Sequence, residues 1–189
     1  MLLEKRQYDD GTIIGLWRIE ESLSSEKRKR EKLAVRLLLG HLLGKSADIL
    51  YNKDGAPSLA DNSFHISISH GKDFAAVILH PTQRVGIDIE QINPRIEKLK
   101  HKFLSENELL QIDPDRQTEH LLVYWCAKET LFKLMPENEI HFAQQLHITP
   151  FPLQEEGTFL AYETRTEQKR RFSLHYEITP DYVMVWGKC

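Results

Sequence analysis

Residues 85–90, with the sequence VGIDIE, constrain the fold of this chain more than any other segment. Apolar residues alternate there with glycine or acidic residues, which is the period-two pattern of a half-buried β-strand. Asp88 and Glu90 therefore project from the same face, roughly 6.5–7 Å apart. Two carboxylates this close repel each other unless a cation or a proton lies between them. The segment thus predicts both a strand and a charged partner.

A second segment supplies a candidate partner. Residues 119–135 have the pattern of a long helix, on which Trp125, Glu129 and Lys133 share one face at i, i+4 and i+8. Glu129 would give a third carboxylate, and a hard cation with oxygen ligands, such as Mg²⁺, would join the three. Lys133, and Lys128 on the neighbouring stripe, could then neutralise phosphate charge.

Both segments also have a purely structural interpretation. Glu129 and Lys133 could form a helical ion pair worth a few tenths of a kcal/mol. Asp88 and Glu90 could simply line an exposed strand face. Strands tend to avoid Asp, however, and like charges on one face are unfavourable without compensation. The two segments together therefore favour a cation site.

The overall composition is typical of a soluble globular protein. Its 189 residues, of which 41% are hydrophobic and 28% charged, can bury one core or two small ones packed together. No apolar run approaches the ~20 residues that a membrane-spanning helix needs, and residues 1–12 lack a secretory signal. Cys126 and Cys189 give neither a disulfide framework nor zinc spacing. We expect a cytoplasmic protein.

The net charge of −3 argues against a generic nucleic-acid binder, yet cations cluster between residues 27 and 36. Only Glu31 opposes them there. The cluster lies in the first two turns of a helix predicted from Ser24 or Ser25 to about residue 43, where the helix N-terminus also attracts anions. A local anionic ligand and a solvated helix face are both compatible with this pattern.

The same predicted helix has an apolar stripe that consists of Leu33, Leu37, Leu38 and Leu42.

The remaining segments read as short strands and helices. A helix is predicted over 96–103, Ser105 with Glu108 forms a capping box for the next one, and Pro136 ends the long helix. The close spacing of the runs between 64 and 90 predicts an antiparallel meander, and the chain as a whole is predicted to be α+β with antiparallel sheets. Strands are expected at 12–19, 48–51, 64–69, 74–79, 84–90, 157–163, 172–178 and 182–186.

Three segments together resemble the motifs of the 4′-phosphopantetheinyl transferase superfamily, in its longer single-chain Sfp-like class. FHISISH at 64–70 resembles the family's serine–histidine strand, and VGIDIE at 85–90 resembles its G-x-D-x-E element. WCAKETLFK at 125–133 resembles its W-x-x-K-E-x-x-x-K helix. The order and spacing also suit the family, and the match spans roughly residues 24–135.

This resemblance implies a fold and a set of site residues. The fold would be a pseudo-dimer of two similar α+β halves, residues 1–83 and 84–189, with the site in the cleft between them. Asp88, Glu90 and Glu129 would hold Mg²⁺ on the pyrophosphate of coenzyme A. The other implied contacts are Lys133 on the phosphates, Ser69 and His70 at the 3′-phosphate region, Lys27 and Arg30 of segment 25–30 on coenzyme A, Arg36 near the nucleotide, and Glu108 assisting deprotonation.

Two positions depart from the family's pattern. The family usually has a basic residue before the proline of the turn that precedes the serine–histidine strand, and Ala56 stands there. Lys53 is a candidate to reach into its place. The residue after the histidine, often serine in the family, is Gly71. Both departures bear on coenzyme A affinity more than on metal binding.

The implied activity is Mg²⁺-dependent transfer of 4′-phosphopantetheine from coenzyme A to a serine of an acyl or peptidyl carrier protein. Glu129 or Glu108, directly or through water, would take the proton of that serine. We expect a monomer, because one chain would supply both halves of the cleft. One alternative is a degenerate relative that binds coenzyme A or a carrier without transferring, and Ala56 is its support in the sequence. A different phosphoryl-transfer enzyme is the other, but no glycine-rich phosphate loop is present.

Overall fold

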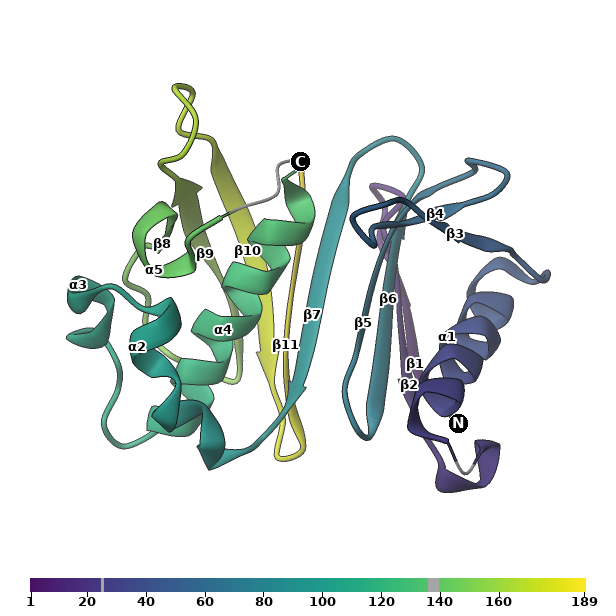
Figure 1. The fold of residues 1–189 in the computed structure, drawn as a ribbon, viewed down its shortest axis with the longest axis horizontal. Helices are drawn as coiled ribbons and strands as arrows, with labels where there is room; N and C mark the ends of the chain where they lie inside the picture. Colours follow the sequence, from purple (N-terminus) through teal and green to yellow (C-terminus); the bar gives the residue numbers. More distant parts are fainter. Residues whose placement is uncertain (25, 136–139) are drawn as a thin grey trace.

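The described residues form two large antiparallel sheets, each covered on its outer side by one long helix (Figure 1), and one small sheet of two strands. We describe residues 1–24, 26–135 and 140–189 of a computed structural model. The first sheet has the order β1(Leu2–Gln7), β2(Ile13–Arg18), β6(Phe74–His80), β5(His65–His70), and α1(Lys27–Leu43) packs on it. A two-stranded sheet of β3(Ile49–Tyr51) and β4(Pro57–Leu59) follows α1 in the chain.

The second sheet is built from the later part of the chain. Its order is β7(Val85–Gln91), β11(Tyr182–Lys188), β10(Arg171–Ile178), β9(Glu156–Glu163), β8(Leu146–Ile148). Helix α4(Gln117–Leu134) covers it and contributes most of its side of the core. The shorter helical elements are η1(Glu21–Leu23), η2(Pro94–Lys98), α2(Lys100–Phe103), α3(Glu106–Leu109) and α5(Phe142–Gln145). No described helix is long and apolar enough to cross a membrane.

The two sheets pack against each other through an apolar layer that no helix enters. The first sheet contributes Ile14, Leu16 and Ile78 among others, and the second contributes Ile87, Met184 and further residues of β7 and β11. Two further clusters lie under α1 and under α4. The layers therefore run α1, first sheet, second sheet, α4. The prediction of an α+β fold with antiparallel sheets is confirmed.

Strand β7 differs from its prediction in two respects. Its residues 85–89 are all buried, so the strand is not half-buried. The apolar side faces the first sheet, and the Gly86 side faces α4 so closely that a Cβ on Gly86 would lie 2.7 Å from the Thr130 carbonyl oxygen. The expected meander is also wrong beyond β5 and β6, because β7 pairs with β11 instead of β6.

Both predicted long helices form, and the buried face of α1 is only in part the predicted one. Helix α1 buries Val35, Leu38, Leu39 and other residues, whereas Leu33 and Leu37 are exposed. Leu38 and Leu42 are buried as predicted, and they lie over Gly15 of β2, whose missing side chain leaves room for them. The predicted cap Ser24 is wrong, because Glu26 is the N-cap of α1 and makes no side-chain cap bond, while Ser24 Oγ accepts the backbone N–H of Glu26 at 3.2 Å just before the helix. The alternative cap Ser25 and the predicted stop Pro136 fall outside the described residues.

The remaining local predictions are largely confirmed. The capping box of Ser105 and Glu108 is present at α3. The single helix expected over 96–103 is two elements, η2 and α2, with Leu99 between them. The predicted strands at 12–19, 48–51, 157–163, 172–178 and 182–186 correspond to β2, β3, β9, β10 and β11. Strands β1, β4 and β8 were not predicted.

Candidate functional site

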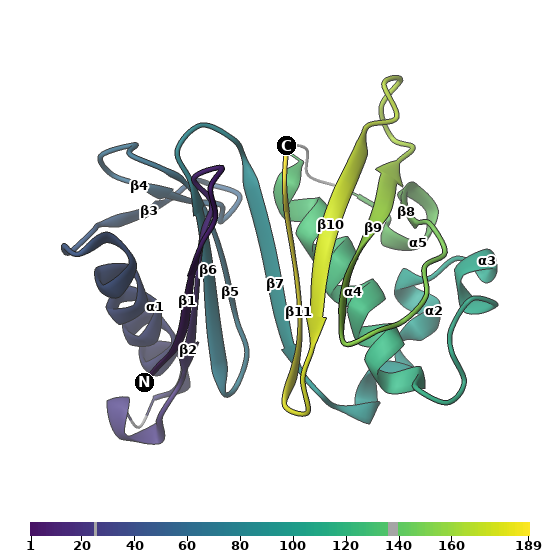
Figure 2. The ribbon, with the colours of Figure 1, turned by 180° about the vertical axis from the view of Figure 1, so that it is seen from behind.

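The site lies where the two sheets meet, at the edge of β7 that faces β5. Strand β7 lies between β11 and β5 in both views of the ribbon (Figure 1, Figure 2). At this edge, two serine hydroxyls of β5, instead of backbone carbonyl groups, accept hydrogen bonds from backbone N–H groups of β7. Ser67 Oγ accepts the N–H of Ile87 at 3.2 Å, and Ser69 Oγ accepts the N–H of Ile89 at 3.3 Å. These bonds explain why both serines are buried although they lie on the polar side of β5.

Asp88 is the central carboxylate of the site. Its side chain is buried, and Oδ1 accepts the Ser69 hydroxyl at 2.8 Å and the Lys133 ammonium at 2.7 Å. Its second oxygen, Oδ2, is buried without a hydrogen-bond partner among the described residues. A buried carboxylate oxygen without a donor is costly. A cation that reached this atom would relieve that cost.

Glu90 and Glu129 join Asp88 in one electrostatic unit. Burial, followed by the charge of Asp88, raises the pKa of Glu90, and the hydrogen bond from Trp125 Nε1 at 3.3 Å opposes that shift. Burial and then the charge of Asp88 raise the pKa of Glu129 to about 7, against the lowering effect of Lys133. One ammonium thus serves three carboxylates, and the site carries an excess of negative charge.

These residues fit a divalent cation in their chemistry but do not form a ready-made ligand set. No three acidic, histidine or cysteine side chains of the described residues gather closely enough to hold a metal ion. The unpartnered Asp88 oxygen and the raised pKa values of Glu90 and Glu129 are what a cation would relieve. The assignment of these three carboxylates as Mg²⁺ ligands stays a prediction.

Lys133 already places a positive charge beside Asp88, the carboxylate that a metal cation would bind. Besides Asp88, its ammonium donates to the carbonyl oxygen of Ile87 at 2.7 Å, and the side chain is one quarter exposed. It can therefore reach from β7 into the adjoining cleft. Lys128 cannot, because its side chain is fully buried on another side of α4. The expectation that Lys128 neutralises phosphate charge is thus wrong.

Lys128 instead forms a buried ion pair with Glu108. Its ammonium donates to Glu108 Oε2 at 2.7 Å and to the carbonyl oxygens of Phe103 and Phe142 at 2.6 and 3.1 Å. Glu108 Oε2 also accepts from Ser105, and its Oε1 accepts the N–H of Ile148 at 3.0 Å. Because both oxygens are engaged and the side chain is buried, these contacts favour a structural role for Glu108. Its predicted part in deprotonation is not tested by them.

The first turns of α1 meet the end of β5 through Glu31. Glu31 lies 3.6 Å from both Lys27 Nζ and His70 Nδ1, and the His70 side chain remains 44% exposed. Arg30 donates to the carbonyl oxygen of Ser24 at 3.0 Å. The structure thus brings His70 and the helix start together. Arg36 is exposed farther along α1 and has no part in these contacts.

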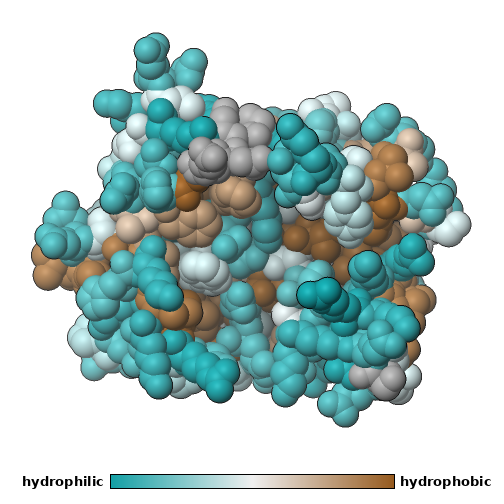
Figure 3. Space-filling model, in the orientation of Figure 1, coloured by the Kyte–Doolittle hydropathy of each residue, from teal (hydrophilic) through white to brown (hydrophobic). Residues whose placement is uncertain are grey.

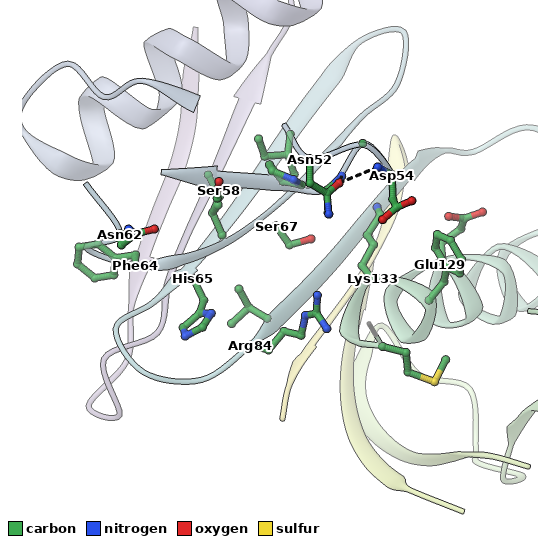
Figure 4. A pocket seen from close by; sticks show the side chains of 18 residues that line it. Asn52, Asp54, Ser58, Asn62, Phe64, His65, Ser67, Arg84, Glu129 and Lys133 are labelled. Atoms are coloured by element: carbon green, nitrogen blue, oxygen red, sulfur yellow. Dashed lines mark hydrogen bonds between the residues drawn. The ribbon is translucent and has the colours of Figure 1, made fainter. Parts of the chain in front are cut away.

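A cleft of about 500 Å³ opens between the two halves beside Lys133 and Glu129 (Figure 4). The turn 52–57, strand β5, the start of β7 and the end of α4 line it, and Arg84 and His65 project into it from the side of the two strands. The face of the molecule seen in Figure 1 carries apolar surface on both halves with polar groups between them (Figure 3). Ala56 belongs to the lining and Lys53 does not.

Sequence reasoning missed three residues of this region. Ser67 closes the edge of β7, Glu31 bridges α1 to His70, and Arg84 lines the cleft. Glu31 had a visible signal, because it follows Lys27 by four residues and is the one acid within the basic cluster. Arg84 continues the alternation of Asp88 and Glu90 toward the start of the strand, which was a signal as well.

Comparison with known proteins identifies the family of this chain. The model of the 4′-phosphopantetheinyl transferase superfamily matches residues 84–186, more than half of the chain. The chain therefore belongs to this superfamily, and its resemblance to that family is confirmed.

Individual relatives carry the same name. The chain is 32% identical over 121 residues to the 4′-phosphopantetheinyl transferase AcpT of Escherichia coli K12, covering 61% of this chain and 62% of the relative. It is 31% identical over 135 residues to Sfp of Bacillus subtilis, covering 59% of each. The match to ffp of Bacillus subtilis is 26% identical over 189 residues, covering 88% of this chain and 82% of ffp. The first two matches span about three fifths of each relative's length.

Proposed function

We propose that this protein transfers 4′-phosphopantetheine from coenzyme A to a serine of an acyl or peptidyl carrier protein, with Mg²⁺ as cofactor. Family membership and relatives named 4′-phosphopantetheinyl transferases support the general reaction. The carrier, coenzyme A and the metal are our inference for this chain. The comparisons do not favour the alternative of a non-catalytic binding module.

The observation that carries the proposal is the state of Asp88. One of its oxygens is occupied by Ser69 and Lys133, and the other is buried without a partner. With Glu90 and Glu129 nearby, this arrangement suits a dication that in turn binds a pyrophosphate. When bound there, Mg²⁺ would stabilise the negative charge that develops on the leaving phosphate.

The proposed reaction exchanges one phosphorus–oxygen bond for another. The carrier serine oxygen forms a bond to the β-phosphorus of coenzyme A, and the bond from that phosphorus to the bridging oxygen breaks. The bridging oxygen leaves with 3′,5′-adenosine bisphosphate, and the serine proton passes to a base. Lys133, within reach of the cleft, would contact the phosphate oxygens and offset their charge.

Glu129 is the better of the two candidate bases. Burial and then the charge of Asp88 raise its pKa to about 7 without metal, and a bound cation would lower that pKa, so that the carboxylate is ionised and can accept a proton. It also lines the cleft. Glu108 already accepts hydrogen bonds on both oxygens inside the second half. We therefore propose that Glu129, directly or through water, receives the serine proton.

A carrier assay tests this function directly. Apo-carrier proteins from fatty-acid, polyketide and peptide-synthetase systems, incubated with coenzyme A, Mg²⁺ and the protein, should gain the mass of phosphopantetheine. Asp88→Ala should abolish the gain while the protein stays folded, and Asp9→Ala, at an exposed turn, should not change it. No gain with any carrier would contradict the transferase, and full activity of Asp88→Ala would remove the metal assignment.

Four further expectations belong to the same proposal. The two sheet-and-helix halves, with a boundary near residues 83 and 84, would be the halves of a pseudo-dimer that supplies the whole cleft from one chain. The protein would act as a monomer in the cytoplasm. Basic and apolar surface beside the cleft would dock the carrier, because carrier proteins tend to be acidic. Calorimetry that shows coenzyme A binding without transfer would instead support the binding module.

A further inference from the structure

Arg84 is a charged residue of the cleft to which neither the motifs nor the family match gives a role. It directly precedes β7, and strand alternation places it on the side of Gly86, Asp88 and Glu90. Its backbone is held by the N–H of Cys189, which donates to the Arg84 carbonyl oxygen at 2.9 Å. The side chain is half-buried and projects into the cleft (Figure 4).

Lys133, which also lines the cleft, has a partner within the protein, because its ammonium is bound to Asp88. Arg84 makes no side-chain hydrogen bond or ion pair with any described residue of the chain. A half-buried guanidinium without a partner loses hydration that nothing repays. Such a group in the wall of a cavity indicates an anion that comes from outside the protein.

The chemistry of a guanidinium narrows the choice of anion. Its planar array of donors binds phosphate through two parallel hydrogen bonds. Lys133 enters the same cavity from α4, and Asn52, Ser58 and Asn62 add neutral polar groups to its wall. We propose that Arg84 binds a phosphate group of the coenzyme A donor. This inference rests on the proposed function and adds a residue to its substrate site.

The same residue accounts for the departure at position 56. Ala56 lies in the wall of the cleft, so a basic residue at this position would be close to a ligand bound there, whereas Lys53 lies outside the wall. The expectation that Lys53 takes over this charge is therefore not supported. Arg84 supplies a positive charge to the same cavity from β7. The cleft thus keeps its phosphate contact although the turn has lost it.

Calorimetric titration of coenzyme A in the presence of Mg²⁺ tests the role of Arg84. Arg84→Gln should weaken binding by about 10- to 100-fold, the range for one charged bidentate contact. Arg171→Gln, the same substitution at an exposed position of β10, should leave the affinity within about twofold of wild type. Lys53→Gln should resemble that control. Adding Ala56→Lys to Arg84→Gln should restore at least part of the lost affinity.

A second donor identifies the phosphate. If Arg84→Gln weakens coenzyme A but not 3′-dephospho-coenzyme A, the contact is to the ribose phosphate. If it weakens both equally, the contact is to the pyrophosphate, and either result supports the proposal. Thermal unfolding gives a control for folding. Without ligand, the melting temperature of Arg84→Gln should be no lower than that of wild type, and added coenzyme A should raise it by less than it raises that of wild type.

Three results would overturn or redirect the inference. Equal affinity of wild type and Arg84→Gln for both donors would overturn it. Unchanged donor binding with a raised KM for the carrier would also overturn it and assign Arg84 to carrier docking. If wild type itself fails to bind coenzyme A, the proposed function fails first, which calorimetry on wild type shows before any variant is made.

Discussion

At the scale of single residues, the site is defined by an imbalance of charge around Asp88. Three carboxylates share one ammonium, and two of them have raised pKa values because burial and the Asp88 charge disfavour their ionised forms. A protein tolerates such a cost at a binding site when the ligand removes it. The metal-free protein should therefore be more stable when one of these charges is neutralised.

Glu129→Gln tests this cost. The Glu129 pKa is about 7 in the folded protein and near 4.5 when unperturbed. The folded state thus holds this proton more tightly, so the residue lowers stability as pH rises from about 4.5 to 7, and the full penalty remains above pH 7. Without metal at about pH 8, the free energy of unfolding of Glu129→Gln should be about 1–3 kcal/mol larger than that of wild type.

The pH dependence separates this explanation from a general gain in packing. Urea unfolding at about pH 4.5 should show almost no difference between Glu129→Gln and wild type, because both side chains are then neutral in the folded state. The variant should also lose transfer activity. A stabilisation that is the same at both pH values would contradict the electrostatic origin.

The buried pair of Glu108 and Lys128 gives a second prediction at this scale. Removal of one partner leaves the other charge buried, so Lys128→Met and Glu108→Gln should each cost about 3–5 kcal/mol of unfolding free energy. The double variant should cost less than the sum of the two. Denaturant unfolding of the four proteins measures both effects.

Activity decides between the two roles of Glu108. If it is structural, Glu108→Gln should keep kcat within about tenfold of wild type at temperatures where the variant is folded. A loss of about 100-fold or more in a folded variant would restore its role as a base.

At the scale of elements, local patterns in the sequence were sufficient to predict most strands and helices but not to predict which strands pair with each other. The alternation at 85–90 identified β7, and helical spacing placed Glu129 and Lys133 on one face of α4. The pairing of β7 with β11, about 95 residues later, has no signature within either strand. The same limit hid the hydroxyl bonds of Ser67, because they depend on which strand edge lies opposite.

Gly86 shows how closely the two main elements of the site approach. Gly86→Ala should push α4 from β7, because the added Cβ would lie 2.7 Å from a backbone oxygen that has little freedom to move. We expect a loss of about 2–4 kcal/mol in unfolding free energy and a loss of transfer activity. Gly40→Ala in α1 meets no atom within 4 Å and should stabilise the protein by about 0.5–1 kcal/mol. Equal effects of the two substitutions would contradict this picture.

At the scale of the whole molecule, the apolar layer between the sheets couples the two halves. It contains residues of β2 and β6 on one side and of β7 and β11 on the other, all of them buried. Neither sheet could expose this face to water alone without losing a large part of its hydrophobic stabilisation. The cleft and the layer lie at the same junction, so the geometry of the site depends on the halves staying together.

Ile87→Ala tests whether the halves unfold as one unit. Ile87 is fully buried within the layer between the sheets, and its truncation should cost about 2–4 kcal/mol. Native-state hydrogen exchange should show the same loss of protection at amides of β6 in the first sheet and of β10 in the second, because both open only through global unfolding. Leu160→Ala, at an exposed position of β9, should change neither. Loss of protection confined to β10 would show instead that the halves unfold separately and that the cleft joins two independent domains.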